Sequence, residues 1–376
     1  MSNTLKNSLY LLAALGLAAS SLVTDAFAVE NIIRPYESAR SAAMGGVKLT
    51  TGLYDENFFA NPARNTANPT WKISLIDLTA EINSSLISNV GSFTSGGGDT
   101  ITKVANTAGS NNHARIQTAM PAFYIPNFWG SKNSFAFGLF TNTQADVDLR
   151  RSYQIQPDVI TDIGPAFSYA RKFMKDDKLS VGATVRLAYR LSGRQGYSFV
   201  DLIKGNSISP AQSGGDGSEI DGDIGATYAM PFHPKGIDFT SAVAIDNVAG
   251  GTYSNLKIKL LKTGIRPIQQ PRSYGFGMKA HKPHLWVFSD PELALEFTDI
   301  GNNPSGSYFR TVHFGGEMRW GIFRPRAGIN QGYWCGGLGI NLKVLEIDLA
   351  SYGEELSLNP GQLQDRRYAV KVAIQI

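Results

Sequence analysis

The last eleven residues, Arg366-Arg367-Tyr368-Ala369-Val370-Lys371-Val372-Ala373-Ile374-Gln375-Ile376, alternate between apolar and polar side chains. Successive side chains of a β-strand point to opposite faces. One face would carry tyrosine, valine and isoleucine, and the other would carry Arg367, Lys371 and Gln375. An open edge strand of this kind invites aggregation, whereas a closed barrel in a lipid bilayer needs it to complete the wall. The segment therefore predicts a transmembrane β-strand.

The same alternation recurs in much of the preceding chain. Val185 and Leu187, for example, alternate with Arg186 and Arg190. After Asn68, about fourteen strand-like bursts of this type follow one another. A β-sandwich would also alternate, with its polar face in bulk water, so the pattern alone leaves both folds open.

The lengths of the connections favour the barrel. An outer-membrane barrel with both ends in the periplasm has short periplasmic turns and longer loops outside. Short connections such as Lys175–Asp177 alternate with long polar ones such as Gln144–Ile160 and Val248–Arg272, and the short turn near Gly332 is the exception. We therefore expect an all-β fold, a single transmembrane antiparallel β-barrel of about fourteen strands over residues 69–376.

The first residues predict export from the cytoplasm. Lys6 supplies a positive charge, Leu9–Leu17 is a short apolar core, and Ala26-Phe27-Ala28 fits the small-x-small cleavage pattern of a signal peptide. No later window approaches the roughly 18 apolar residues of a membrane-spanning helix. We expect residues 1–28 to be a signal peptide cleaved near Ala28, and the mature chain to lie in the outer membrane of a Gram-negative-type cell.

Composition excludes several classes of protein. The single cysteine, Cys335, rules out an intramolecular disulfide framework. A net charge of +4, with dispersed lysine and arginine, is too mild to indicate nucleic acid as a partner. The expected partners are outer-membrane lipids and the barrel-assembly machinery. Aromatic residues near expected strand ends, Trp71 and Trp320 among them, favour an interfacial girdle.

Charged residues gather on the polar faces of the expected strands. In a barrel these faces line the lumen, where the charges could form a polar pathway or simply pair with one another. The candidate lumen-lining charges are Arg186, Arg190, Glu292, Glu296, Glu317, Arg319, Arg324, Arg326, Glu346, Asp348, Arg367 and Lys371.

Enzymatic chemistry is not expected. Nucleophilic catalysis would require a serine, a histidine and an orienting acid or amide within reach of one another, and the sequence has no Gly-x-Ser-x-Gly elbow. The pair His281 and His284 is interrupted by Pro283 and lacks further ligands at metal spacing. We expect no catalytic residue, no metal site and no cofactor.

Between the expected signal and the first strand lies a segment that does not alternate. It contains Ser38-Ala39-Arg40, Met44-Gly45-Gly46, Asp55-Glu56-Asn57 and Asn61-Pro62-Ala63. This order ahead of a barrel of about fourteen strands resembles the FadL-type outer-membrane transporters, and it is also similar to their PorV-like relatives. The resemblance implies an N-terminal hatch, about Val29–Asn68, inside the barrel, with Gly45, Gly46, Asn61, Pro62 and Ala63 as hatch or gating residues.

The resemblance leaves the function open between two classes. A FadL-type channel or transporter would pass a small hydrophobic or amphipathic molecule past the hatch. A PorV-like protein would hold a secreted protein partner through outer loops such as Ser192–Ser218. The chain departs from the family pattern because it shows no matching hydrophobic ligand-pocket residues and ends on Ile376 rather than an aromatic residue. A barrel with neither role is the third hypothesis.

Overall fold

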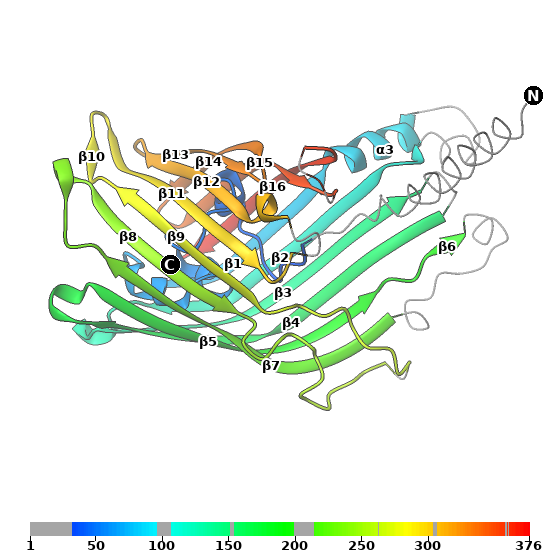
Figure 1. The fold of residues 1–376 in the computed structure, drawn as a ribbon, viewed down its shortest axis with the longest axis horizontal. Helices are drawn as coiled ribbons and strands as arrows, with labels where there is room; N and C mark the ends of the chain where they lie inside the picture. Colours follow the sequence, from blue (N-terminus) through cyan, green and yellow to red (C-terminus); the bar gives the residue numbers. More distant parts are fainter. Residues whose placement is uncertain are drawn as a thin grey trace, which may run out of the picture.

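The computed structural model describes residues 32–95, 107–150, 154–198, 214–261, 263–303, 307–357, 359 and 361–376. The expected signal segment, 1–28, lies outside these ranges. Strands make up most of the described chain (Figure 1). They are β1 (Lys72–Asn83), β2 (Asn111–Ile125), β3 (Asn133–Leu149), β4 (Gln154–Phe173), β5 (Leu179–Gly193), β6 (Tyr197–Ser198), β7 (Gly214–Ala229), β8 (Asp238–Asp246), β9 (Ser273–His281), β10 (His284–Leu285), β11 (Phe288–Ile300), β12 (Val312–Arg319), β13 (Phe323–Asn330), β14 (Tyr333–Leu342), β15 (Leu345–Glu355) and β16 (Gln364–Gln375).

The strands close into one antiparallel barrel. The described residues form a 16-stranded sheet, and without the two-residue strands β6 and β10 the wall has 14 strands. Each strand of the wall pairs with its neighbour in sequence, β9 pairs with β11, and β16 pairs with β1 to complete the circle. The closing pair aligns Thr79 with Lys371 and Ile82 with Tyr368. The expected fold class and strand number are confirmed.

The two faces of the wall differ as the alternation predicts. In β16, Tyr368, Val370 and Val372 are exposed on the outside, while Arg367 and Lys371 are buried inside. The large apolar side chains of the other strands follow the same rule, since many of them are exposed on the outer face. The wall is therefore apolar towards its surroundings and polar towards its lumen.

The lengths of the strands differ around the barrel. β3 and β4 have 17 and 20 residues, and β12 and β13 have 8 each. The long loop expected over Gln144–Ile160 is wrong, because Gln144–Leu149 and Gln154–Ile160 are paired strand residues. The polar residues of this stretch, such as Asp146 and Asp158, had suggested a loop, but they extend the alternating pattern of the two strands.

The ends of the barrel carry different features. The turns between β12 and β13 and between β14 and β15 are short and lie at the end where β16 finishes. α3 (Ser84–Ser95), between β1 and β2, lies at the opposite end (Figure 1). Five exposed tryptophans lie at or next to strand ends, as an interfacial girdle requires; they are Trp71, Trp129, Trp286, Trp320 and Trp334. We call the two ends of the wall the turn end and the loop end.

Residues 32–68, called the N-terminal segment below, precede the wall and are mostly buried. They form α2 (Ala39–Ala43) and two 3-10 helices, η1 (Tyr54–Phe58) and η2 (Pro62–Ala67). The short 3-10 helices η3 (Phe128–Gly130), η4 (Lys175–Asp177), η5 (Pro234–Gly236) and η6 (Tyr308–Thr311) occur between strands. In the described ranges, we find no helix with the length and apolar character needed to cross a membrane.

Candidate functional site

The N-terminal segment runs along the inside of the barrel from one end to the other. Near its beginning, the backbone oxygen of Ile33 accepts a 2.6 Å hydrogen bond from the Gln270 amide. Arg34 pairs with Asp299 at 2.9 Å and with Glu354 at 2.6 Å. These partners lie near the loop end of the wall, whereas the segment finishes at the turn end, where β1 begins. The segment therefore fills a lengthwise part of the lumen.

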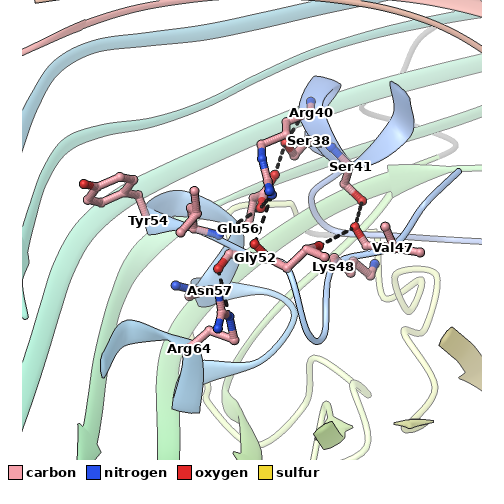
Figure 2. Close-up of polar contacts among 12 residues, drawn as sticks. Ser38, Arg40, Ser41, Val47, Lys48, Gly52, Tyr54, Glu56, Asn57 and Arg64 are labelled. Carbon is pink, nitrogen blue, oxygen red and sulfur yellow. Dashed lines mark hydrogen bonds and ion pairs between the residues drawn. The ribbon is translucent and has the colours of Figure 1, made fainter. Parts of the chain in front are cut away.

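Arg40 of α2 is the most connected cation of this segment. Its guanidinium pairs with Glu56 at 3.0 Å, with Glu292 at 2.8 Å and with Glu317 at 2.8 Å. Figure 2 shows Arg40 extending towards Glu56 of the same segment. Glu292 and Glu317 belong to β11 and β12. Because a buried charge is costly unless it is paired, these contacts hold α2 against this side of the wall.

Glu296 of β11 holds the backbone that follows α2. Its carboxylate accepts hydrogen bonds from the backbone N–H groups of Lys48, Leu49 and Thr50 at 2.7, 2.8 and 2.8 Å, and from the Thr50 hydroxyl at 2.6 Å. Three successive N–H groups directed at one anion form a backbone nest. A carboxylate of the wall thus fixes the loop that follows α2.

Lys371 of the closing strand joins the segment to the wall. Its ammonium lies 2.7 Å from Asp55 and 3.1 Å from Asp77 of β1. Tyr36 also donates a hydrogen bond to Asp55. Burial alone would raise the pKa of Asp55, but the Lys371 charge and the two hydrogen bonds hold that pKa below its ordinary value. Asp55 is therefore an anion whose charge is neutralised by Lys371 of the strand that closes the barrel.

The motif residues of the segment lie where it touches the wall most closely. Gly45 has φ +75°, and a Cβ there would lie 2.4 Å from the backbone oxygen of Phe314. The Asn61 side chain caps η2 by accepting from the Ala63 N–H at 3.1 Å. A Cβ on Gly182 of β5 would lie 2.6 Å from the Ala63 nitrogen. Small residues on both sides therefore allow backbone to pack on backbone.

Two other motif residues contribute to the same contacts. The backbone oxygen of Gly45 lies 2.9 Å from Nδ1 of His313, and a Cβ on Gly46 would lie 2.5 Å from that nitrogen. Pro62 occupies the first turn of η2, where its missing N–H costs nothing. Figure 2 shows a further contact within the segment, in which Arg64 extends towards the Gly52 backbone oxygen, 3.2 Å away.

A cluster of aromatic rings lies between the segment and strands β2 and β3. Tyr36 stacks on Phe59 at 5.0 Å between ring centroids, and Phe59 meets Phe140 edge-on at 5.1 Å. The cluster continues from Phe58 to Tyr124 at 5.6 Å, and from Tyr124 to Tyr54 at 5.4 Å. We call these six residues the aromatic cluster. It forms an apolar strip inside an otherwise polar lumen.

The aromatic cluster ends at a cavity near the turn end of the wall. The cavity has a volume of about 200 Å³. It lies between the N-terminal segment, which contributes Leu53 and Tyr54, and the strand ends that carry Lys72, Arg324 and Glu346. Two smaller spaces of about 10 and 20 Å³ lie further along the segment, beside Arg34 and Lys48. Each of these is about large enough for one water molecule.

The structure brings most of the candidate lumen charges together inside the barrel. Nine of the twelve form ion pairs with inner-wall or segment residues; they are Arg186, Arg190, Glu292, Glu317, Arg326, Glu346, Asp348, Arg367 and Lys371. Glu296 binds the backbone nest, and Arg324 lines the cavity. Arg319 differs, because it pairs with Asp290 at 3.1 Å and both side chains are about half exposed at the turn end.

Several interior charges were not singled out from the sequence. Arg34 and Arg40 lie in a segment without alternation, so nothing in the pattern indicated which way they point. Glu81 and Asp146 flank His113 at 2.6 and 2.7 Å inside the barrel. Their inward register in β1 and β3 was the available signal, and Asp146 was missed because its stretch resembles a loop.

The surroundings of His113 are those of a structural ion-pair cluster. His113 is enclosed by Glu81, Asp146 and the neighbouring arginines, and no serine is among its hydrogen-bond partners. Within the described ranges, no group of three or more histidine, cysteine or acidic side chains is placed to hold a metal ion.

The architecture defines an outer-membrane β-barrel, since the wall is closed, apolar outside and polar inside. Comparison with solved structures narrows the class. The Ralstonia pickettii toluene transporter TbuX is similar over 92% of this chain and 99% of its own, with 15% identity and a TM-score of 0.53. A deltaS2S3 mutant of the monoaromatic hydrocarbon channel TodX is similar over the same shares, with 12% identity and a TM-score of 0.50.

No protein-family model and no curated protein sequence matched the chain. The likeness in structure nevertheless covers nearly the whole of each neighbour. The chain has the fold of the FadL-type outer-membrane transporters, as the motif order indicated.

Proposed function

We propose that this protein passes a small hydrophobic or amphipathic molecule across the outer membrane, and that the N-terminal segment is the hatch that gates the passage. The aromatic cluster is the observation that carries the proposal. Its six rings are buried against one another, and they would give an apolar molecule a series of apolar contacts in a largely ion-paired lumen once the N-terminal segment moves. The two structural neighbours are named as a toluene transporter and a monoaromatic hydrocarbon channel, which supports an aromatic passenger here.

The polar contacts of the hatch suit a part that stays in place until it is displaced. Arg34, Arg40 and Lys371 each join the hatch to the wall through short ion pairs. The small spaces beside the hatch leave little room for a solute to pass it. Passage therefore requires a movement of the hatch or of the rings that contact it.

A reversible cross-link tests gating without removing any part of the chain. Thr66 of η2 and Ser180 of β5 have hydroxyl oxygens 2.9 Å apart. The double variant Thr66→Cys with Ser180→Cys should form a disulfide on oxidation. Uptake of labelled toluene by cells producing this variant should fall, and a reductant should restore it. The single variant Thr66→Cys is the control.

Deletion of residues 29–68 is the complementary experiment. Single-channel conductance in planar bilayers should rise when the hatch is absent, provided that the barrel still shows heat-modifiable mobility on a gel. Unchanged conductance of a folded deletion variant, together with unchanged uptake by the oxidised double-cysteine variant, would contradict gating by this segment.

A second candidate function is the binding of a partner protein at the loop end. The connection between β8 and β9 exposes the apolar side chains Ile258, Leu260 and Ile265, of which Leu260 is 74% exposed. Exposed apolar side chains grouped in this way are typical of interaction sites. Replacement of these three residues by serine should abolish recovery of a specific protein in a pull-down while uptake of toluene is unchanged. Loss of uptake instead would favour the transport role of the loop.

A further inference from the structure

We propose that the 200 Å³ cavity at the turn end is a binding site for a small organic carboxylate with an apolar body. The proposal rests on the proposed function, because it names the chemical class of passenger that the exit side of the lumen would bind. It goes beyond that function because the two neighbours are named for uncharged aromatic hydrocarbons.

The acidic groups of the cavity already have cationic partners. Each of the four carboxylates that line it pairs with a lysine or arginine: Asp55 with Lys371 at 2.7 Å, Glu56 with Arg40 at 3.0 Å, Glu346 with Lys72 at 3.4 Å and Asp348 with Arg326 at 2.5 Å. A neutral set of ion pairs would need no further charge. The net charge of the cavity therefore depends on the lining residues that are outside these four pairs.

Two cations of the lining are left over. Neither Arg324 nor Lys343 makes a side-chain hydrogen bond or an ion pair within 4 Å with the part of the chain that the structure describes. The Arg324 charge interacts with Glu317 and Glu346 at longer range. Arg324 presents a planar fork of donors that matches a carboxylate in two parallel hydrogen bonds. The cavity therefore holds a surplus of positive charge with unused donors.

Part of the cavity lining is apolar. Leu53 and Tyr54 line it, and the Tyr54 ring is the last member of the aromatic cluster. The Lys72 ammonium lies 3.9 Å above the same ring, which fixes the ring in place. A molecule that leaves the aromatic cluster would thus keep its apolar body on Tyr54 and direct a carboxylate at Arg324. The cavity thus offers an apolar contact for the body of an amphipathic molecule and a cation for its carboxylate.

Benzoate is a suitable probe, because it combines a carboxylate with one aromatic ring. Its binding to the purified full-length barrel would be measured by isothermal titration calorimetry, with benzyl alcohol as the uncharged analogue. Benzoate should bind at one site and benzyl alcohol at least tenfold more weakly, a difference of about 1.4 kcal/mol. This comparison needs no variant. Equal binding of the two compounds would overturn the proposal.

Two arginine variants locate the site. Arg324→Gln should weaken benzoate binding at least tenfold, and Arg324→Lys should retain part of it because the charge remains. Arg319→Gln is the matched control, since Arg319 lies outside the cavity and pairs with Asp290 at the surface. Unchanged binding in folded Arg324→Gln would refute the site. Inorganic phosphate that competes as strongly as benzoate would refute the apolar half of the assignment.

Uptake of toluene separates this proposal from the function on which it rests. Toluene has no charge to engage Arg324, so Arg324→Gln should weaken benzoate binding by a larger factor than it lowers toluene uptake. Uptake of toluene without benzoate binding would refute the carboxylate site alone. A barrel that admits no toluene, yet binds benzoate at Arg324, would refute the general passage of small aromatics and keep the site.

Discussion

Removal of the Lys371 charge should destabilise the barrel and the N-terminal segment together. In Lys371→Met, Asp55 would keep its hydrogen bond from Tyr36 but lose its cation. Asp77 would also lose its cation, since Lys371 is the one ion-pair partner of its side chain among the described residues. Breaking a buried ion pair by removing one partner typically costs about 3–5 kcal/mol. Because two buried carboxylates lose one shared cation, we expect the upper part of this range.

The free energy of unfolding would be measured by urea titration of the purified barrel, followed by tryptophan fluorescence. Lys132→Met is the matched control, because Lys132 forms an exposed pair with Asp177 at 2.6 Å and such pairs contribute about 0–1 kcal/mol. The double variant Lys371→Met with Asp77→Asn should recover part of the loss. If Lys371→Met costs no more than Lys132→Met, the interior pairing does not stabilise the molecule and the reasoning fails.

Three further outcomes follow from the hatch contacts. Gly45→Ala should lower the free energy of unfolding by more than Gly236→Ala, because both positions have positive φ but only Gly45 faces backbone atoms within 4 Å; equal urea midpoints would contradict the close approach. Glu296→Gln should speed hydrogen exchange at the Lys48–Thr50 amides, since charge-assisted hydrogen bonds are replaced by weaker ones; unchanged exchange would show that the nest does not depend on the charge. Phe59→Ala should cost about 3–5 kcal/mol and lower uptake of toluene, because Phe59 joins Tyr36 to Phe140 in the aromatic cluster; increased uptake in a folded barrel would show that the ring blocks the passenger rather than guiding it.

The barrel was predictable because its signal is repeated. Each strand carries the same alternation, and β16 displays it in full, with Val370 and Val372 outside and Lys371 inside. The alternation did not lead to a correct prediction at the β3–β4 hairpin. There, Asp146 and Asp158 face each other across the pair, and polarity on a long strand was mistaken for a loop. Periodicity identifies a strand well when its outer face is apolar and poorly where polar residues extend it.

The sequence predicted the two parts of the candidate site, the wall charges and the N-terminal segment, but not the contacts between them. Inward register identified Glu292 and Glu317, and the motif order identified the segment that contains Arg40. Nothing in the sequence connects these residues, because the Arg40–Glu317 contact spans 277 positions and depends on how α2 lies in the lumen. That Arg324 has no ion-pair partner among the described residues could not be predicted either, since it depends on how the four carboxylates of the cavity pair with other cations.

The course of the N-terminal segment through the lumen has a consequence for the folding of the chain. Arg34, close to the first described residue, contacts Glu354 across 320 positions, and Asp55 contacts Lys371 across 316. Such non-local contacts form late and slow the folding of a chain. Since β1 follows the N-terminal segment directly and pairs with β16, closure of the wall brings the first and the last described strands together. The pair between Asp55 and Lys371 can therefore form only when the N-terminal segment and β16 are both in place.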